Sequence, residues 1–270
     1  MATIKVNFAP TPDPIEPMQT RILTRLASVP GRVGFYYHNL ATAETIAHAA
    51  DERYLAASVI KLPICAAVAR MADDGRADLD ERIPVRECDI VPGCGTLQHM
   101  AAEVDVLSVR TLCRLMITVS DNMATNLLIN RFGISTLNAE FAAMGLTGTR
   151  LERKMFDAAA SAAGLQNRIV PREMGGLLAT IHAHTLGSET ASRFVEQTLL
   201  AQQINHKIPG YLKGVRIAHK TGEDTGITND VGIVYTAHPF VLAFACNETD
   251  VPEAERAMRE ISLWLGEANQ

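Results

Sequence analysis

The chain has 270 residues, of which 47% are hydrophobic and 20% charged, and its formal net charge is −5. At ~100–200 residues per domain, this length suits one large domain or two interleaved ones, and the composition excludes a disordered, collagen-like or coiled-coil chain. Lysine and arginine form no cluster of the kind that binds a phosphate backbone, which argues against nucleic acid as a partner. The most apolar stretch, residues 231–246, is interrupted by His238 and Pro239, so no run approaches the ~20 residues of a membrane span.

The N-terminus and the cysteines bear on the compartment. The first 17 residues hold one lysine and four prolines without an apolar segment, which predicts a short strand and a linker rather than an export signal. We therefore expect a cytoplasmic protein, or a periplasmic or secreted one if a leader has been removed. The cysteines have neither CxxC nor metal-ligand spacing, so we expect no metal and no cofactor. Their odd number favours a reducing compartment, and they are Cys65, Cys88, Cys94, Cys113 and Cys246.

Hydrophobic periodicity divides the chain into three stretches. Before about residue 57, it predicts a helix over residues 15–28 and strands over 32–38 and 45–50. From Ser58 to about Gln203 helical spacing dominates, with helix starts near Ser58, Ser108, Ala124, Pro171 and Ser188. After residue 214, it predicts strands over 215–220, 231–235 and 240–246, the last two as a hairpin, and then a helix from Pro252. This order predicts a sheet built from both ends of the chain, with a helical domain inserted into it.

Three short motifs stand in order along the chain: Ser58-Val59-Ile60-Lys61, Ser120-Asp121-Asn122 and Lys220-Thr221-Gly222. Taken singly they are weak, because about one S-x-x-K is expected by chance in a chain of this length. The two triplets are rarer, and all three in order at predicted element boundaries are rarer still. Together they indicate one catalytic site.

The first motif suits nucleophilic catalysis. Ser58 and Lys61 are three residues apart on a predicted helix, so they share a face and lie within hydrogen-bonding reach. A serine hydroxyl needs a neighbouring base to become a good nucleophile. Lys61 serves as that base only if burial and another cation lower its pKa, and Lys220 is the candidate cation.

The other two motifs suit proton transfer and substrate binding. Ser120 is placed to relay a proton to a leaving nitrogen, whereas its neighbour Asp121 is expected to be structural. The backbone N–H groups of Ser58 and Glu223 would form an oxyanion hole, and screening of substrates is a further option for the Glu223 side chain. The expected substrate-binding residues are Asn122, Lys220, Thr221, Gly222 and Glu223.

The three motifs resemble those of the serine β-lactamase and penicillin-binding (DD-peptidase) superfamily, and most closely its class A-like branch. The resemblance covers nearly the whole chain beyond residue 20 and includes residues 62–63, 114–118, 124–128, 170–174 and 219–223. It implies an α/β fold of the α+β type, in which an antiparallel sheet flanked by helices carries an inserted all-helical domain. Residues 1–57 and 204–270 would form the α/β domain and residues 58–203 the helical one. The active site would lie at their interface and form an acyl-serine without metal.

One departure from the resemblance concerns release of the acyl group. Residues 149–154 resemble the start of the loop that carries the deacylating glutamate of class A β-lactamases, but Met155 stands at the glutamate position and Ala159 at that of a following asparagine. A thioether does not activate water. Glu152 lies three residues too early, which leaves Asp157, two residues late, as the one nearby carboxylate considered as a base.

The sequence leaves several alternatives open. Cys65 and Cys113 lie at positions that carry a disulfide in some exported relatives, and the other interpretation is a pair of buried free thiols. The leading function is a serine hydrolase acting on a carboxylate-bearing small molecule, with β-lactams, hydrolysed slowly, as the first expectation. A DD-peptidase, a hydrolase of another small amide, and a sensor that stays acylated are the alternatives. No feature of the sequence indicates an oligomeric state.

Overall fold

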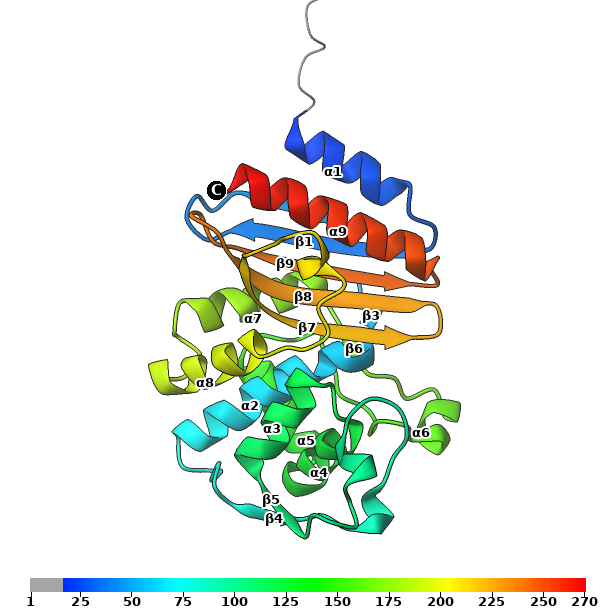
Figure 1. The fold of residues 1–270 in the computed structure, drawn as a ribbon, viewed down its shortest axis with the longest axis vertical. Coiled ribbons are helices and arrows are strands. Elements are labelled where there is room, and N and C mark those ends of the chain that lie inside the picture. The colour runs from blue at the N-terminus through cyan, green and yellow to red at the C-terminus, as the bar shows by residue number, and fades with distance from the viewer. Residues whose placement is uncertain (1–16) are drawn as a thin grey trace, which may run out of the picture.

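The protein is described from a computed structural model, which covers residues 17–270. The strand and linker predicted over residues 1–17 lie outside the described part except for Pro17. The centre is a five-stranded sheet in the order β2-β1-β9-β8-β7 (Figure 1). It is antiparallel and built from both ends of the chain, as expected. Its strands are β1 (Arg32–Asn39), β2 (Thr45–His48), β7 (Arg216–Asp224), β8 (Ile227–Tyr235) and β9 (Phe240–Asn247).

The sheet joins the two ends of the chain. β1 pairs along its whole length with β9, in a register that sets Phe35 opposite Phe244. The helices α1 (Met18–Ala27) and α9 (Val251–Ala268) cover one face. The other face packs against α7 (Pro171–His182) and α8 (Glu189–Leu200). Because both faces are covered, β9 is buried along its full length and reads as a nearly continuous apolar run.

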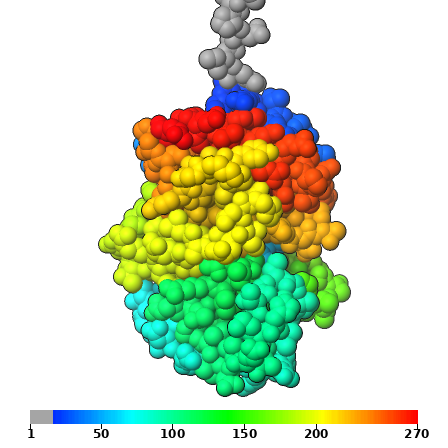
Figure 2. Space-filling model, in the orientation of Figure 1, coloured from blue at the N-terminus to red at the C-terminus, as the bar shows by residue number. Residues whose placement is uncertain are grey.

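The remaining elements form the other half of the molecule. Figure 2 shows the first and last helices together at one end and the segments coloured cyan to green at the other. These segments are the 3₁₀ helices η1 (Ala57–Ile60), η2 (Glu87–Asp89) and η3 (Leu97–His99) and the helices α2 (Lys61–Asp73), α3 (Val109–Thr118), α4 (Asn122–Phe132), α5 (Ile134–Ala143) and α6 (Ala158–Ala162). Two small sheets accompany them, β3 (Tyr54–Leu55) with β6 (Arg168–Ile169) and β4 (Arg82–Pro84) with β5 (Val106–Ser108), and η4 (Ile208–Gly210) precedes β7.

The helix starts follow from side-chain caps. Ser108, Asp121, Ser188 and Asp250 each accept a hydrogen bond from a backbone N–H in the first turn of α3, α4, α8 and α9, which satisfies donors that a helix leaves unpaired. The structural role expected for Asp121 is therefore confirmed. Within the described residues, no helix is long and apolar enough to cross a membrane.

The structure differs from the sequence prediction at several elements. β8 begins at Ile227, four residues earlier than predicted, because Thr228, Asn229 and Asp230 are fully buried despite being polar. The prediction also lacks α5, α6, the small sheets and the 3₁₀ helices. Helices α7 and α8 lie directly against the sheet, so the domain boundary at residue 203 stays a prediction.

The close approach of α7 to β1 gives a test of the packing. A Cβ atom on Gly175 would lie 2.3 Å from Cδ1 of Tyr36, whereas one on Gly176 would meet nothing within 4 Å. We expect Gly175→Ala to lower the free energy of unfolding by ~1–3 kcal/mol through overpacking. Gly176→Ala should raise it by ~0.5–1 kcal/mol, since alanine favours the helix. Urea unfolding of both variants measures the two changes in the free energy of unfolding. Equal changes would contradict the close packing of α7 against β1.

Candidate active site

Ser58 lies on η1, immediately before α2, where polar side chains from the sheet hold the backbone. Asn229 on β8 donates to the carbonyl oxygens of Leu55 and Ala56 at 2.9 and 3.1 Å. Asn247 on β9 accepts from the Leu55 N–H at 2.6 Å. The residue before Ser58, Ala57, has a φ of 42°, a left-handed conformation that is costly for alanine. The buried asparagines thus fix a strained turn that presents Ser58 at a half-buried position.

The Lys61 amine contacts Ser58, Ser120 and Asn122. Its Nζ lies 2.9 Å from Ser58 Oγ, 2.7 Å from Asn122 Oδ1, and 2.7 and 3.1 Å from the carbonyl oxygen and Oγ of Ser120. The side chain is completely buried. Burial, and then the charge of Lys220, hold the pKa of Lys61 well below its usual value of 10.5. The lowered pKa favours the neutral amine, which is the form that can accept the proton of Ser58.

Ser120 joins the two lysines. Its Oγ lies 3.1 Å from Nζ of Lys61 and 3.1 Å from Nζ of Lys220, which also donates to the Thr221 carbonyl at 2.8 Å. Ser120 has a φ of 56°, and the turn it forms directs its oxygen atoms toward Lys61. Burial lowers the pKa of Lys220 to about 7, with a further lowering by Lys207 and an opposing effect of Asp230. The three sequence motifs therefore meet at one point of the fold.

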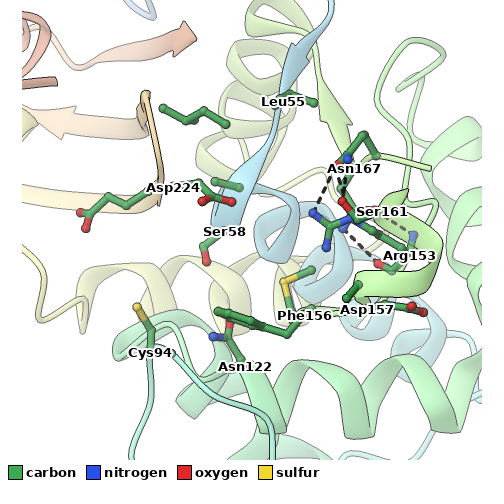
Figure 3. A pocket seen from close by; sticks show the side chains of 17 residues that line it. Leu55, Ser58, Cys94, Asn122, Arg153, Phe156, Asp157, Ser161, Asn167 and Asp224 are labelled. Atoms are coloured by element: carbon green, nitrogen blue, oxygen red, sulfur yellow. Dashed lines mark hydrogen bonds between the residues drawn. The ribbon is translucent and has the colours of Figure 1, made fainter. Parts of the chain in front are cut away.

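A cavity of about 340 Å³ opens beside Ser58. Its walls come from η1, the loop before η3, the start of α4, residues 153–167 and the end of β7 (Figure 3). Asn122 and Glu223 line it, whereas Lys61, Ser120 and Lys220 lie behind its surface. Cys94, an exposed thiol that the sequence analysis did not single out, also lines it.

The loop that carries Met155 is held by two asparagines. Asn126 on α4 exchanges hydrogen bonds with the backbone of Met155, donating to its carbonyl at 3.0 Å and accepting from its N–H at 2.8 Å. Asn167 accepts from the N–H groups of Glu152 and Arg153, while its own carbonyl accepts from Ala56 beside Ser58. Met155 is thereby fixed at the cavity wall with 8% of its surface exposed.

The two carboxylates near Met155, those of Glu152 and Asp157, accept hydrogen bonds from backbone N–H groups. Glu152 accepts a hydrogen bond from the Gln166 N–H at 3.0 Å. Asp157 lines the cavity, but its Oδ1 accepts from the Ala160 N–H at 2.9 Å and caps α6. Figure 3 shows Asp157 and Ser58 on opposite sides of the pocket. Asp157 as a deacylating base stays a prediction.

Glu223 is paired with a buried cation that the sequence analysis missed. Lys207 Nζ lies 3.1 Å from its carboxylate and also donates to the carbonyl oxygens of Gly222 and Asn229. Glu223, His206 and Glu255 are the one group in the described part of the chain whose atoms are spaced to hold a metal ion. Because the Lys207 ammonium already lies against Glu223, we interpret the group as an ion-pair network.

Two further groups lie behind the site. His219 precedes Lys220 on β7, so its side chain points to the other face of the strand, where its ring nitrogens lie 3.0 Å from Asp230 and 2.9 Å from Asn205. Cys65 and Cys113 are buried thiols in contact with each other, and this contact together with burial raises the pKa of Cys113 well above its usual value. In the structure, Cys65 and Cys113 are therefore free thiols and not a disulfide.

A serine activated by a buried lysine, between a sheet and a group of helices, is the arrangement of a serine acyl-transfer enzyme. The profile of the beta-lactamase enzyme family matches residues 17–268, and the chain belongs to this family. Similar solved structures include a β-lactamase from Sphaerobacter thermophilus, with 30% identity, a TM-score of 0.84, and coverage of 93% of this chain and 96% of that chain. PBP-A is 29% identical with a TM-score of 0.83, covering 94% and 96%. An ancestral class A β-lactamase is 25% identical with a TM-score of 0.84, covering 93% and 100%.

The lowered pKa values of the lysines predict a pH profile for acylation. The rate should rise with pH as Lys61 loses its proton, and fall as Lys220 loses its own near about pH 7. Arginine stays protonated at all accessible pH values, so Lys220→Arg should keep the rising limb and lose the falling one. Stopped-flow acylation by nitrocefin across the pH range measures both limbs. A rising limb only near 10.5, the usual value for lysine, would contradict the proposed base.

Proposed function

We propose that the protein is a serine hydrolase in which Ser58 forms an acyl-enzyme with the carbonyl of a lactam, amide or ester. The substrate bears a carboxylate, and β-lactams are its first candidates. The contact that carries this proposal is the 2.9 Å approach of the buried Lys61 amine to Ser58 Oγ. The similarity to β-lactamases and to PBP-A supports the choice of substrate.

The contacts suggest a sequence of proton transfers. Neutral Lys61 takes the Ser58 proton as Oγ bonds to the carbonyl carbon, and the N–H groups of Ser58 and Glu223 receive the oxyanion. When the carbon–nitrogen bond breaks, Ser120 gives its proton to the leaving nitrogen and recovers one from Lys61, 3.1 Å away. Lys61 returns to its neutral form. Asn122 binds the substrate amide, and Lys220 with Thr221 binds the carboxylate.

Release of the acyl group is the slow step in this proposal. Water must attack the ester at Ser58, and a base must take its proton. Met155 offers no base at the cavity wall, and the Asp157 carboxylate already accepts from the Ala160 N–H. Acylation is therefore expected to be much faster than hydrolysis of the acyl-enzyme.

Slow release also suits a second function. A DD-peptidase-like enzyme hands its acyl group to an amine or releases it slowly, and a sensor keeps it. The observation that favours this alternative is the apolar Met155, together with the similarity to PBP-A. A structure of a PBP-A mutant is described as an acyl-enzyme complex with penicillin G.

The nucleophile is tested by mass spectrometry of the intact protein after mixing with a penicillin and a cephalosporin. We expect a lasting adduct, of the mass of the added β-lactam, on the wild type and none on Ser58→Ala. Peptide mapping should place the adduct on Ser58. No adduct and no consumption of either β-lactam would exclude these substrates, whereas rapid steady-state turnover would refute slow release.

The role of Met155 is tested by restoring a carboxylate. Met155→Glu should speed hydrolysis of the acyl-enzyme by ~10²-fold or more, the usual contribution of a positioned general base. Met155→Gln has nearly the same shape without the charge and is the matched control, with little expected gain. Both are measured by the decay of the adduct. Equal rates in the two variants would show that a carboxylate at this position does not activate water.

A further inference from the structure

Strand β7 directs Asp224 toward the cavity. Side chains alternate between the faces of a strand, so Lys220, Gly222 and Asp224 share one face. A Cβ atom on Gly222 would lie 2.9 Å from the Ala56 carbonyl and 3.1 Å from the Val59 N–H, which shows that this face looks onto the 3₁₀ helix carrying Ser58. Asp224, two residues further along, emerges from the same face at the cavity edge and lines it.

The Asp224 carboxylate is not neutralised by a protein cation. Within residues 17–270 its one hydrogen bond is with the Thr225 N–H at 2.7 Å, and no ion pair involves it. The adjacent Glu223, by contrast, is paired with Lys207 at 3.1 Å. The guanidinium of Arg153 also lines the cavity and keeps its charge, because its partner Gln166, at 3.1 and 3.2 Å, is neutral. Figure 3 shows Arg153 across the pocket from Asp224, so the free charge at the β7 edge itself is negative.

The site is consequently dipolar. Lys220 and Thr221 offer a cation and a hydroxyl at the end that binds the substrate carboxylate, and Asp224 offers an anion at the end of β7. Phe156, 57% exposed, supplies an aromatic ring to the lining of the same cavity. An ammonium group is attracted both by a carboxylate and by the face of an aromatic ring.

We infer that Asp224 determines specificity for acyl groups that carry a protonated amine, so that the preferred substrates are zwitterions with a carboxylate on the leaving side and an ammonium on the acyl side. This inference rests on the proposed function. Amino-acyl and peptide amides with a free amino group have this chemistry, and so do aminopenicillins. An anionic substituent at the same place is disfavoured by the same charge.

Three penicillins test the inference because they differ at one carbon atom of the acyl group. Ampicillin carries an amine there, penicillin G a hydrogen atom and carbenicillin a carboxylate. At mildly acidic pH, with the amine protonated, we expect acylation of Ser58 to be fastest with ampicillin and slowest with carbenicillin. The second-order rate constants should differ by about tenfold between these extremes, and salt should reduce the difference.

Asp224→Asn removes the charge and keeps the shape. In this variant the ratio of the ampicillin rate constant to that of carbenicillin should fall to within about twofold of unity. Glu44→Gln removes one exposed charge beside β2, at the opposite edge of the sheet, and should leave the ratio unchanged. An unchanged ratio in Asp224→Asn, or equal rates in the wild type, would overturn the inference while the proposed function stands. Failure of all three penicillins to acylate Ser58 would instead refute the proposed function.

Discussion

The burial of two lysine amines around one serine hydroxyl is the constraint on which the rest of the site depends. Lys61 and Lys220 both have no exposed surface, and their nitrogens, each 3.1 Å from Ser120 Oγ, lie within about 6 Å of each other. Two ammonium ions at that separation in a poorly solvated place repel strongly. The repulsion disfavours two protons on the pair, so one amine is favoured as the neutral base that we propose while the other keeps its charge.

Such a pair needs a rigid surrounding, and the fold supplies it from both ends of the chain. Lys220 lies in the middle of the edge strand β7, Lys61 at the start of a buried helix, and Ser120 in a strained turn between two other helices. Buried asparagines join these elements at backbone level, as Asn229 does beneath η1. A buried amide must be hydrogen-bonded to be tolerated, so each of these residues fixes the relative position of the segments that it joins.

Much of this arrangement follows from the sequence, because its determinants are local. The apolar runs of β9, the caps at Ser108 and Asp121, and the three motifs are each visible within a few residues. Asn126, Asn167 and Lys207 were not identified, since their partners lie 14 or more residues away. The available signal was a polar residue inside an otherwise apolar helix or strand, as at Asn126 and at Asn229 on β8. The sequence pattern alone does not indicate which segment such a residue hydrogen-bonds to.

In the loop of residues 149–170, the position of the backbone does not depend on the side chain at residue 155. In the described part of the chain, the side chains of Asn126 and Asn167 hydrogen-bond only to the backbone of this loop, at Met155, Glu152 and Arg153. Contacts of that kind position the chain without regard to the side chain at residue 155. The loop can therefore keep its shape whether this residue is a carboxylate or a thioether, and the lifetime of an acyl group can change through one side chain without rebuilding the site. In the proposed mechanism, formation of the acyl-enzyme depends on the buried lysines, whereas its hydrolysis depends on the side chain at residue 155 in the cavity wall.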